Sequence, residues 1–502
     1  MDMETLLQYD WGRMAPEFTI LLTATLLSLI DLCLPKRTER KGLFILGLAG
    51  IVIALLFLIN QIHLEPTLIL MDTYRFDGLA VSFKFILLVG ALLTMMLAMG
   101  NKMVNQGEYV YLMLTALLGA MMMASSADLI TLIVGLELLS ISSYILVGLQ
   151  RRSQKANEGA MKYVVQGGIA SSILLFGFSY LYGLTGSTQL SVISELLPSV
   201  IRSDVQGLLV VALVFIFTGI AFKLAVVPFS MWAPDVYEGA PVPIAAFLSG
   251  VSKAAGFVLL LRLSSSIFTI TELEPMVSAL LPWLAVGAAV TMMVGNVVAL
   301  RQTNIKRLLA YSSIAHAGYL LVPVVSFSPL TVENMWFYLL VYLFMTIGAF
   351  AIVYILSEQH ETEGRDIFKG LYSRSPFLAI AMTIILLSLA GIPGTAGFFA
   401  KLHLILGAFS GTSVELALVI VMVLTTILSY IYYFGIIAHM FLRKNPFSFN
   451  EIHIPAYCIP LITSCVMVIV VLGVLPNIAL DFYHNHVDFV NLTKGLWNGV
   501  IK

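Results

Sequence analysis

The sequence predicts an all-α protein that crosses a membrane many times, with about fourteen transmembrane helices. Of its 502 residues, 59% are apolar and 11% are charged, whereas soluble domains average about 45–50% apolar and about 25% charged residues. This composition excludes a soluble enzyme, and it excludes a disordered chain, which would be polar and rich in charge. The net charge of −1 provides no basic surface of the kind that binds nucleic acid.

The apolar runs have the length that a membrane requires. A helix that rises about 1.5 Å per residue needs roughly 20 residues to cross hydrocarbon about 30 Å thick. Only short polar loops separate the runs, so the chain has no room for a soluble domain. In chain order we expect spans near residues 16–34, 43–62, 78–98, 108–126, 128–149, 160–183, 207–230, 241–263, 278–300, 305–325, 334–356, 376–408, 414–440 and 456–476.

Charges in the loops predict the orientation. Acidic residues precede the first run and basic residues follow it, which is the reverse of a secretory signal. Loops rich in Lys and Arg stay on the cytoplasmic side of a membrane, so one orientation explains the alternation, with an even number of spans and both termini on the outer face. The basic loop residues are Lys102, Arg151, Arg152, Lys155, Arg301, Lys306, Arg307, Arg365, Lys369, Arg374, Arg443 and Lys444.

Two of the spans, the seventh and the twelfth, carry residues that interrupt a helix. Residues 223–243 contain four prolines, and residues 390–401 contain Pro393 among three glycines. Proline removes a backbone donor, and unpaired backbone at membrane depth is tolerated only where it is buried in protein or lines a water-filled cavity. A pair of interrupted helices in corresponding halves indicates a transport path built from inverted repeats.

The spacing of ionisable residues supports such a repeat. Lys223 and Lys401 lie 178 positions apart, and Glu137 and His316 lie 179 apart. We therefore expect one membrane domain over 1–502 with four regions. These are the first three helices (1–105), a first five-helix repeat with helices 4–8 (106–263), a second repeat with helices 9–13 (277–440), and the last helix with the tail (441–502).

Five ionisable side chains fall deep within the predicted spans: Glu137, Lys223, Lys253, His316 and Lys401. A charged side chain at the bilayer centre costs about 2.5–3.5 kcal/mol on insertion scales, so these positions indicate function. We interpret Glu137 and Lys223 as a gating pair, Lys253 and His316 as central members of a proton relay, and Lys401 as its exit-side group. The alternative is structural, because a buried charge pair can fix helix packing.

For the other charged residues near the predicted spans, the sequence favours structural roles. Lys84, Lys162 and Arg262 lie near predicted helix ends, where long side chains reach back to the interface, so we expect anchors rather than relay members. Asp235 and Glu238 precede a proline-rich turn at the predicted cytoplasmic mouth. They either collect protons or bond the turn, and the turn role is favoured.

Sites for metals and cofactors are not indicated. The three cysteines form no CxxC pair, and the nucleotide and zinc motifs GxGxxG, GxxxxGK[ST] and HExxH do not occur. We therefore expect no metal and no redox cofactor on this chain. If it pumps protons, the energy comes from elsewhere.

Four stretches resemble the antiporter-like membrane subunits of respiratory complex I, the proton-translocating NADH:quinone oxidoreductase. They are residues 126–150, 157–188, 223–257 (which contains PDVYEGAP) and 304–321 (NIKRLLAYSSIAHAGYLL). The resemblance, greatest to the bacterial subunit N (subunit 2) branch, covers nearly the whole chain. It implies fourteen helices, two inverted five-helix repeats and interrupted helices seven and twelve.

The same resemblance assigns residues and partners. Glu137 matches the family's helix-five glutamate, Lys223 and Lys253 match its lysines in helices seven and eight, and Lys401 falls on the helix-twelve position. It implies a translocase subunit in the bacterial cell membrane that contacts neighbouring antiporter-like and small membrane subunits. FMN, iron–sulfur clusters and quinone would belong to other subunits. The alternative function is a membrane subunit of a multi-subunit cation/proton antiporter, which needs a similar charged relay.

Overall fold

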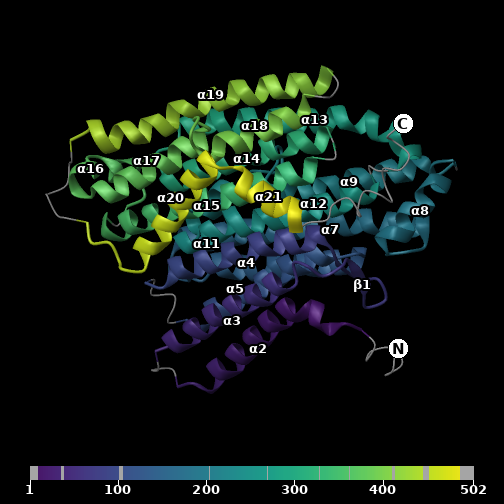
Figure 1. The fold of residues 1–502 in the computed structure, drawn as a ribbon, viewed down its shortest axis with the longest axis horizontal. Coiled ribbons are helices and arrows are strands. Elements are labelled where there is room, and N and C mark those ends of the chain that lie inside the picture. The colour runs from purple at the N-terminus through teal and green to yellow at the C-terminus, as the bar shows by residue number, and fades with distance from the viewer. Residues whose placement is uncertain are drawn as a thin grey trace.

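The structure is a computed structural model that describes residues 9–486, apart from residues 36–38, 101–105, 203, 268–269, 327, 329, 361, 410–412 and 445–451. Lys102 and the end of the predicted tail, residues 487–502, lie outside the described residues. Helices dominate the described part of the chain (Figure 1). In order they are η1 (Trp11–Met14), α2 (Ala15–Cys33), α3 (Lys41–Asn60), α4 (Gly78–Ala98), α5 (Gly107–Ser125), α6 (Leu129–Val147), α7 (Gln154–Thr185), α8 (Leu190–Ile201), α9 (Gln206–Leu224), α10 (Trp232–Gly239), α11 (Val242–Phe247), η3 (Leu248–Ser252), α12 (Lys253–Ile267), η4 (Thr271–Leu273), α13 (Glu274–Leu300), α14 (Ile305–Ser326), α15 (Thr331–His360), η5 (Arg365–Phe368), α16 (Leu371–Arg374), α17 (Pro376–Ala390), α18 (Ala396–Ala408), α19 (Ser413–Leu442), α20 (Cys458–Val474) and α21 (Asn477–His486).

The predicted all-α membrane fold is confirmed. Among the described residues, twelve helices are long and apolar enough to cross a membrane, and α20 with α21, bent by 85°, makes up to thirteen. The predicted run 376–408 is divided between α17 and α18, each shorter than a span. The predicted total of fourteen therefore stays a prediction.

Both predicted interruptions are present. Helix α9 ends at Leu224, followed by Ala225 in the left-handed region (φ +57°), and α10 begins only at Trp232. Helix α17 ends at Ala390, followed by Gly391, also left-handed (φ +82°), and α18 begins at Ala396. Glycine adopts this conformation at no steric cost. At Gly397 a Cβ would lie 1.9 Å from the Ser388 carbonyl oxygen, so only glycine lets the two halves approach so closely.

Two helices that carry predicted relay residues, α12 and α14, lie at the centre of the bundle beside α15. Helices α12 and α15 are buried along nearly their whole length, and α14 almost as completely. Figure 1 shows α14 and α15 in the middle of the molecule, α19 along one long edge, and α2 and α3 at the opposite edge. A helix that is apolar all round belongs in such a core.

The two predicted repeats contain similarly packed helix pairs. A Cβ at Gly119 in α5 would lie 2.5 Å from the carbonyl oxygen of Gly135 in α6. A Cβ at Gly295 in α13 would lie 2.6 Å from the backbone nitrogen of Ala315 in α14. Small residues allow such close approach between membrane helices. The division into repeats stays a prediction.

A short antiparallel hairpin, β1 (Thr67–Ile69) and β2 (Tyr74–Phe76), was not predicted. Its turn contains three successive residues with positive φ, Leu70, Met71 and Asp72. The sequence offers little warning, because none of these residues is a glycine. The hairpin leads directly into Asp77, whose side chain accepts a hydrogen bond from the Ala80 backbone and begins α4.

Candidate functional site

Lys223 lies at the end of α9 and is 7% exposed. Its Nζ donates a hydrogen bond to Ser140 Oγ of α6 at 3.1 Å. A small cavity of about 10 Å³ adjoins it, lined by Ser140, Tyr144, Tyr163 and Lys223 among others. That is about the space that one water molecule needs, so the ammonium has a polar neighbour and room for a water.

Glu137 lies in the middle of α6, one turn before Ser140. No ion pair within 4.0 Å joins it to Lys223 in the described part of the chain, although its charge still acts on Lys223. Its Oε1 atom is buried and has no hydrogen-bond donor among the described residues. The predicted pair is therefore not in direct contact, because Lys223 is bonded to Ser140 instead. Its gating role stays a prediction.

Lys253 is the first residue of α12 and is 4% exposed. The π-helical segment η3 stands directly before it, and such segments are rare and frequent at functional sites. The Nζ atom donates to the backbone oxygen and to Oγ of Ser313 in α14. It also lies 5.4 Å from the centre of the Tyr342 ring, close enough for a cation–π interaction.

His316 lies one turn beyond Ser313 on α14 and is 2% exposed. Its Nδ1 shares a 2.6 Å hydrogen bond with the Tyr338 hydroxyl. The ring centre is 5.0 Å from that of Tyr342, the ring beneath Lys253. The charges of Lys253 and Lys401 both act on His316. His316 therefore lies near the charges of both lysines, and its role as a central member of the relay stays a prediction.

Lys401 is the last of the five predicted residues and lies on α18, beside the break between α17 and α18. Its Nζ donates to the carbonyl oxygens of Leu389 and Ala390, each at 3.1 Å. These are the last carbonyls of α17, and a cation is favoured at the negative end of a helix dipole. The same Nζ lies 4.9 Å from the Tyr319 ring centre. Lys401 thus joins the broken helix to α14.

Lys223 also lies next to α12, the helix that carries Lys253. Gly256, one turn beyond Lys253 on α12, packs so closely on α9 that a Cβ there would lie 3.3 Å from Lys223 Cγ. The five predicted residues therefore follow one buried line from α6 through α9, α12 and α14 to α18. From the sequence Ser140 could line a hydrated path, but helix packing was favoured for it, and the other lining residues were missed because aromatic and hydroxyl residues are common in membrane helices. The lining residues are Ser140, Ser313, Tyr319, Tyr338 and Tyr342.

The expectation that Lys84 reaches the membrane interface was wrong. Lys84 is fully buried, forms an ion pair with Glu17 of α2, and donates to the Tyr74 hydroxyl at 2.7 Å. Because the Glu17 carboxylate balances the Lys84 charge inside the protein, the side chain does not extend to water.

Arg262 is likewise not an interfacial anchor. It is 2% exposed and binds Asp77 through two nitrogens, at 2.5 and 2.6 Å. It also donates to the Ala124 carbonyl oxygen. Planar two-point binding of this kind is the strongest form of ion pair. Lys162, by contrast, is partly exposed near the start of α7, where an anchor was expected.

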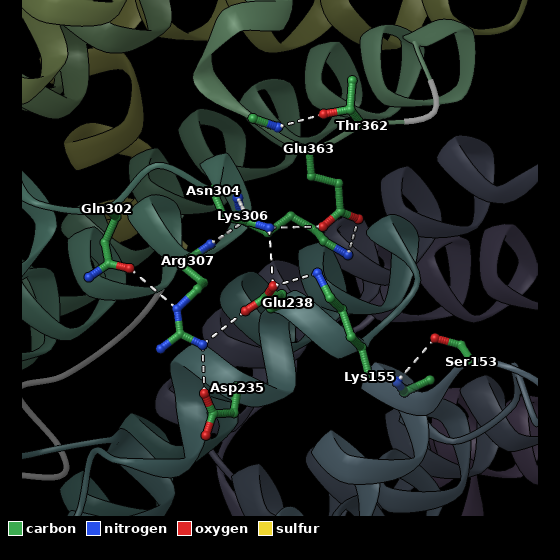
Figure 2. A network of polar contacts seen from close by, with 12 residues as sticks. Ser153, Lys155, Asp235, Glu238, Gln302, Asn304, Lys306, Arg307, Thr362 and Glu363 are labelled. Atoms are coloured by element: carbon green, nitrogen blue, oxygen red, sulfur yellow. Dashed lines mark hydrogen bonds and ion pairs between the residues drawn. The ribbon is translucent and has the colours of Figure 1, made fainter.

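Asp235 and Glu238 belong to a network of ion pairs at the end of the bundle predicted to face the cytoplasm (Figure 2). Arg307 of α14 binds Asp235 at 2.6 Å and Glu238 at 2.9 Å. Lys162 binds Asp235 at 2.6 Å, and Lys155 binds Glu238 at 2.8 Å. Each carboxylate therefore holds two cationic side chains and cross-links α7, α10 and α14. The favoured prediction, that these residues bond the turn, was wrong, because their partners lie on other helices.

This network has a predictable pH dependence. Burial by itself would raise the pKa of Asp235, but hydrogen bonds from Lys162 and Arg307 lower it below its ordinary value, and the pKa of Glu238 is lowered in the same way by Lys155 and Arg307. Carboxylates with lowered pKa stabilise the fold above their ordinary pKa, and this contribution disappears as pH falls through the lowered value.

Arg307→Leu should lower the free energy of unfolding by about 1 kcal/mol at neutral pH, because Arg307 is partly exposed and each carboxylate keeps one lysine. The difference from the parent protein should begin to shrink near about pH 4, as the carboxylates of the unfolded chain take up protons, and should continue to shrink as pH falls toward the lowered pKa values. Thermal unfolding of the detergent-purified protein between pH 3.5 and 8 measures both. Arg301→Leu, an exposed arginine of the same region, is the control, and an equal loss in both variants would contradict the cross-link.

No three His, Cys, Asp or Glu side chains gather closely enough to hold a metal ion in the part of the chain that the structure describes.

Comparisons with known proteins agree with this arrangement. The family model "NADH:quinone oxidoreductase/Mrp antiporter, TM" matches residues 126–474. NADH-quinone oxidoreductase subunit N from Anoxybacillus flavithermus (strain DSM 21510 / WK1) is 51% identical over 96% of this chain and 98% of that relative. The chain belongs to the NADH-quinone oxidoreductase subunit N family.

Two further relatives extend the subunit N assignment. Subunit N from Bacillus anthracis is 47% identical over 97% of each chain. A chain in the structure of respiratory complex I from Thermus thermophilus with bound aureothin is 30% identical, with a TM-score of 0.78 over 93% of this chain and 98% of that chain. The family model covers both predicted functions, whereas these near-full-length relatives are oxidoreductase subunits. The buried line from Lys223 to Lys401 therefore lies in a chain with the subunit N fold.

Proposed function

We propose that this chain is a proton-translocating membrane-arm subunit of NADH:quinone oxidoreductase. In this proposal Glu137, Lys223, Lys253, His316 and Lys401 form a relay that couples electron transfer from NADH to quinone to proton pumping. The observation that carries the proposal is the buried line itself, in which three lysines and a histidine follow one another between two broken helices. Membership of the subunit N family supports the identity of the driving reaction.

The chemistry follows from the partners of the lysines. Lys253 and Lys401 are bound by carbonyl, hydroxyl and aromatic groups, and within the described residues neither contacts a carboxylate. A buried ammonium with only neutral partners is costly, so a small change in nearby charge shifts it between holding and releasing a proton. A displacement of Glu137 relative to Lys223 would supply such a change and pass it along the line.

Neighbouring membrane subunits are the proposed partners. The large apolar residues Ile130, Val134, Ile141 and Ile145 are exposed along one face of α6, and Glu137 falls on the same face by helical spacing. A carboxylate that faces lipid at membrane depth is expensive, so a protein partner over this face is favoured. FMN, iron–sulfur clusters and quinone would be held by other subunits. The proposed location is the bacterial cell membrane, with both termini on the outer face.

The discriminating experiment is purification of the tagged chain from its native membrane in a mild detergent. Rotenone- or piericidin-sensitive NADH:quinone activity that co-purifies with flavin and iron–sulfur absorbance would support the proposal. Co-purification only with cofactor-free membrane proteins, together with cation-dependent proton exchange in vesicles, would establish the antiporter instead. The "Mrp antiporter" part of the matching family model makes this the second candidate.

Lys223→Ala tests the relay assignment at its first lysine. Because Ser140 and the adjoining cavity can accept a water in place of the ammonium, the variant should assemble, while NADH-driven proton pumping falls by about tenfold or more. Assembly is measured by native gel and pumping by a pH-sensitive dye in inverted vesicles. Lys41→Ala, an exposed lysine at the start of α3, is the control. Full pumping by Lys223→Ala would remove Lys223 from the relay.

A further inference from the structure

A polar hollow of about 660 Å³ opens beside the ion-pair network, where α10, α14 and α15 meet. It lies at the end of the bundle that the loop charges predict to face the cytoplasm. Among the side chains that line it are Lys155, Glu238, Asn304, Lys306, Glu358 and Glu363. A hollow lined with so many polar groups is filled by water, so it brings water to the charged residues at its wall.

Lys306 is the most deeply buried of these charged groups. It is 3% exposed, and its Nζ forms an ion pair with Glu363 at 2.6 Å and donates to the Ala240 carbonyl oxygen at 2.9 Å. The Glu363 side chain is 29% exposed, so it borders the hollow on one side and Lys306 on the other. Backbone hydrogen bonds at 2.8 and 2.9 Å fix the Glu363 loop to residues 303–305.

Glu363 differs from the two carboxylates beside it. Asp235 and Glu238 each bind two cationic side chains. Glu363 binds one cation, Lys306, and otherwise accepts a hydrogen bond from the Asn304 amide at 3.1 Å (Figure 2). Within the described residues, Glu363 therefore has fewer cationic partners than Asp235 or Glu238.

Lys306 also lies on the same helix as a residue that binds the relay. Lys306 and Ser313 are seven residues apart on α14, which places them on the same face and about 10 Å apart along the helix axis. Ser313 is the residue that binds Lys253. The side chain of Tyr237, next to Glu238 in α10, lies close to both Ser313 and Ser249. Hydroxyl groups thus occupy the interval between the hollow and Lys253.

We propose that Glu363 and Lys306 form the cytoplasmic proton-uptake site that supplies Lys253, an inference that rests on the proposed function. Lys306, as an ammonium, gives a proton through the Tyr237 and Ser313 hydroxyls and intervening water to the neutral amine of Lys253. A hydronium ion in the hollow then protonates the Glu363 carboxylate, and the resulting carboxyl group passes this proton to the Lys306 amine, which restores the ion pair. One proton leaves the cytoplasmic water, one arrives on Lys253, and both uptake residues regain their starting forms.

The test uses the intact complex in inverted vesicles, with NADH oxidation and proton pumping measured from pH 6 to 8.5. Glu363→Gln should reduce pumping and coupled turnover by about tenfold, with the deficit largest at high pH, where hydronium is scarce. Glu363→Asp keeps the carboxylate and should retain most of the activity. Glu358→Gln, a carboxylate that lines the same hollow without contact to Lys306 in the described structure, should pump like the parent.

A purely structural role for the pair gives different results. Glu363→Gln leaves the Lys306 ammonium buried without its partner, which can prevent assembly. The double variant Lys306→Met with Glu363→Met removes both charges and should assemble. Normal pumping by the assembled double variant, or a loss in Glu363→Gln that is equal at every pH, overturns the uptake site.

The failure of this inference and of the proposed function can be told apart. Lys253→Met is measured in the same vesicles. Loss of pumping in Lys253→Met with full pumping in the double variant would reject only the uptake site. Full pumping in both would reject the relay itself.

Discussion

Lys253→Met should leave the enzyme assembled and reduce proton pumping by about a hundredfold or more, the range expected when a positioned proton-transfer group is removed. Methionine is unbranched and similar in length, so it fills the space without a charge. The Ser313 oxygens and the Tyr342 ring that bind the ammonium remain, but no amine is left to accept or release the relayed proton. In the buried line this residue lies between Lys223 and His316, which is why the largest effect is expected here.

The measurement is NADH-driven acidification of inverted vesicles, normalised to the amount of assembled complex. Lys444→Met removes an exposed lysine two residues beyond the end of α19 and should pump normally. Pumping above half of the parent value in Lys253→Met would show that protons bypass this lysine, and the relay would have to be redrawn through other groups.

Asp77→Leu should destabilise the subunit more than any single change in the relay. The substitution leaves the Arg262 guanidinium, 2% exposed, without its carboxylate, and breaking a buried ion pair in this way typically costs about 3–5 kcal/mol. Asp77 also begins α4 by accepting a hydrogen bond from Ala80, which adds to the loss. We expect little assembled complex and a lower unfolding temperature, as seen by fluorescence-detected gel filtration after heating.

The double variant Asp77→Leu with Arg262→Leu provides the matched control. Replacing both members of a buried pair by apolar residues is often neutral or stabilising, so assembly should recover in large part. Glu272→Gln, in the exposed pair with Arg202, should change the unfolding temperature little. A double variant as unstable as Asp77→Leu would mean that α4, rather than the ion pair, is the sensitive element.

The Asp77 pair also has a defined pH range. Burial alone would raise the pKa of the Asp77 carboxyl, but Arg262 lowers it below the ordinary value. The pair therefore stabilises the subunit at every pH above the ordinary carboxyl pKa, and its contribution is lost only as pH falls through the lowered pKa. Between pH 6 and 8 the difference between Asp77→Leu and the parent should be constant.

Local chemistry in the sequence determined much of the fold. Apolar runs of the right length fix the spans because the bilayer thickness sets one length for all of them. Proline and glycine fix the two breaks because each changes the backbone of its own neighbourhood, and the structure ends α9 and α17 at those places. The depth of Lys253, His316 and Lys401 follows from their position in the runs, so their burial was also predictable.

The partners of these charges were decided only by the tertiary structure. Arg262 binds Asp77, 185 positions away, and no local pattern selects one distant carboxylate from the others. For the same reason the sequence alone does not show that Lys84 lies away from the interface. It also does not show that Lys223 binds Ser140 rather than Glu137, or that Glu363 binds Lys306. Hydrophobic thickness and backbone chemistry act along the chain, whereas the energy of a buried charge depends on which helices pack beside it.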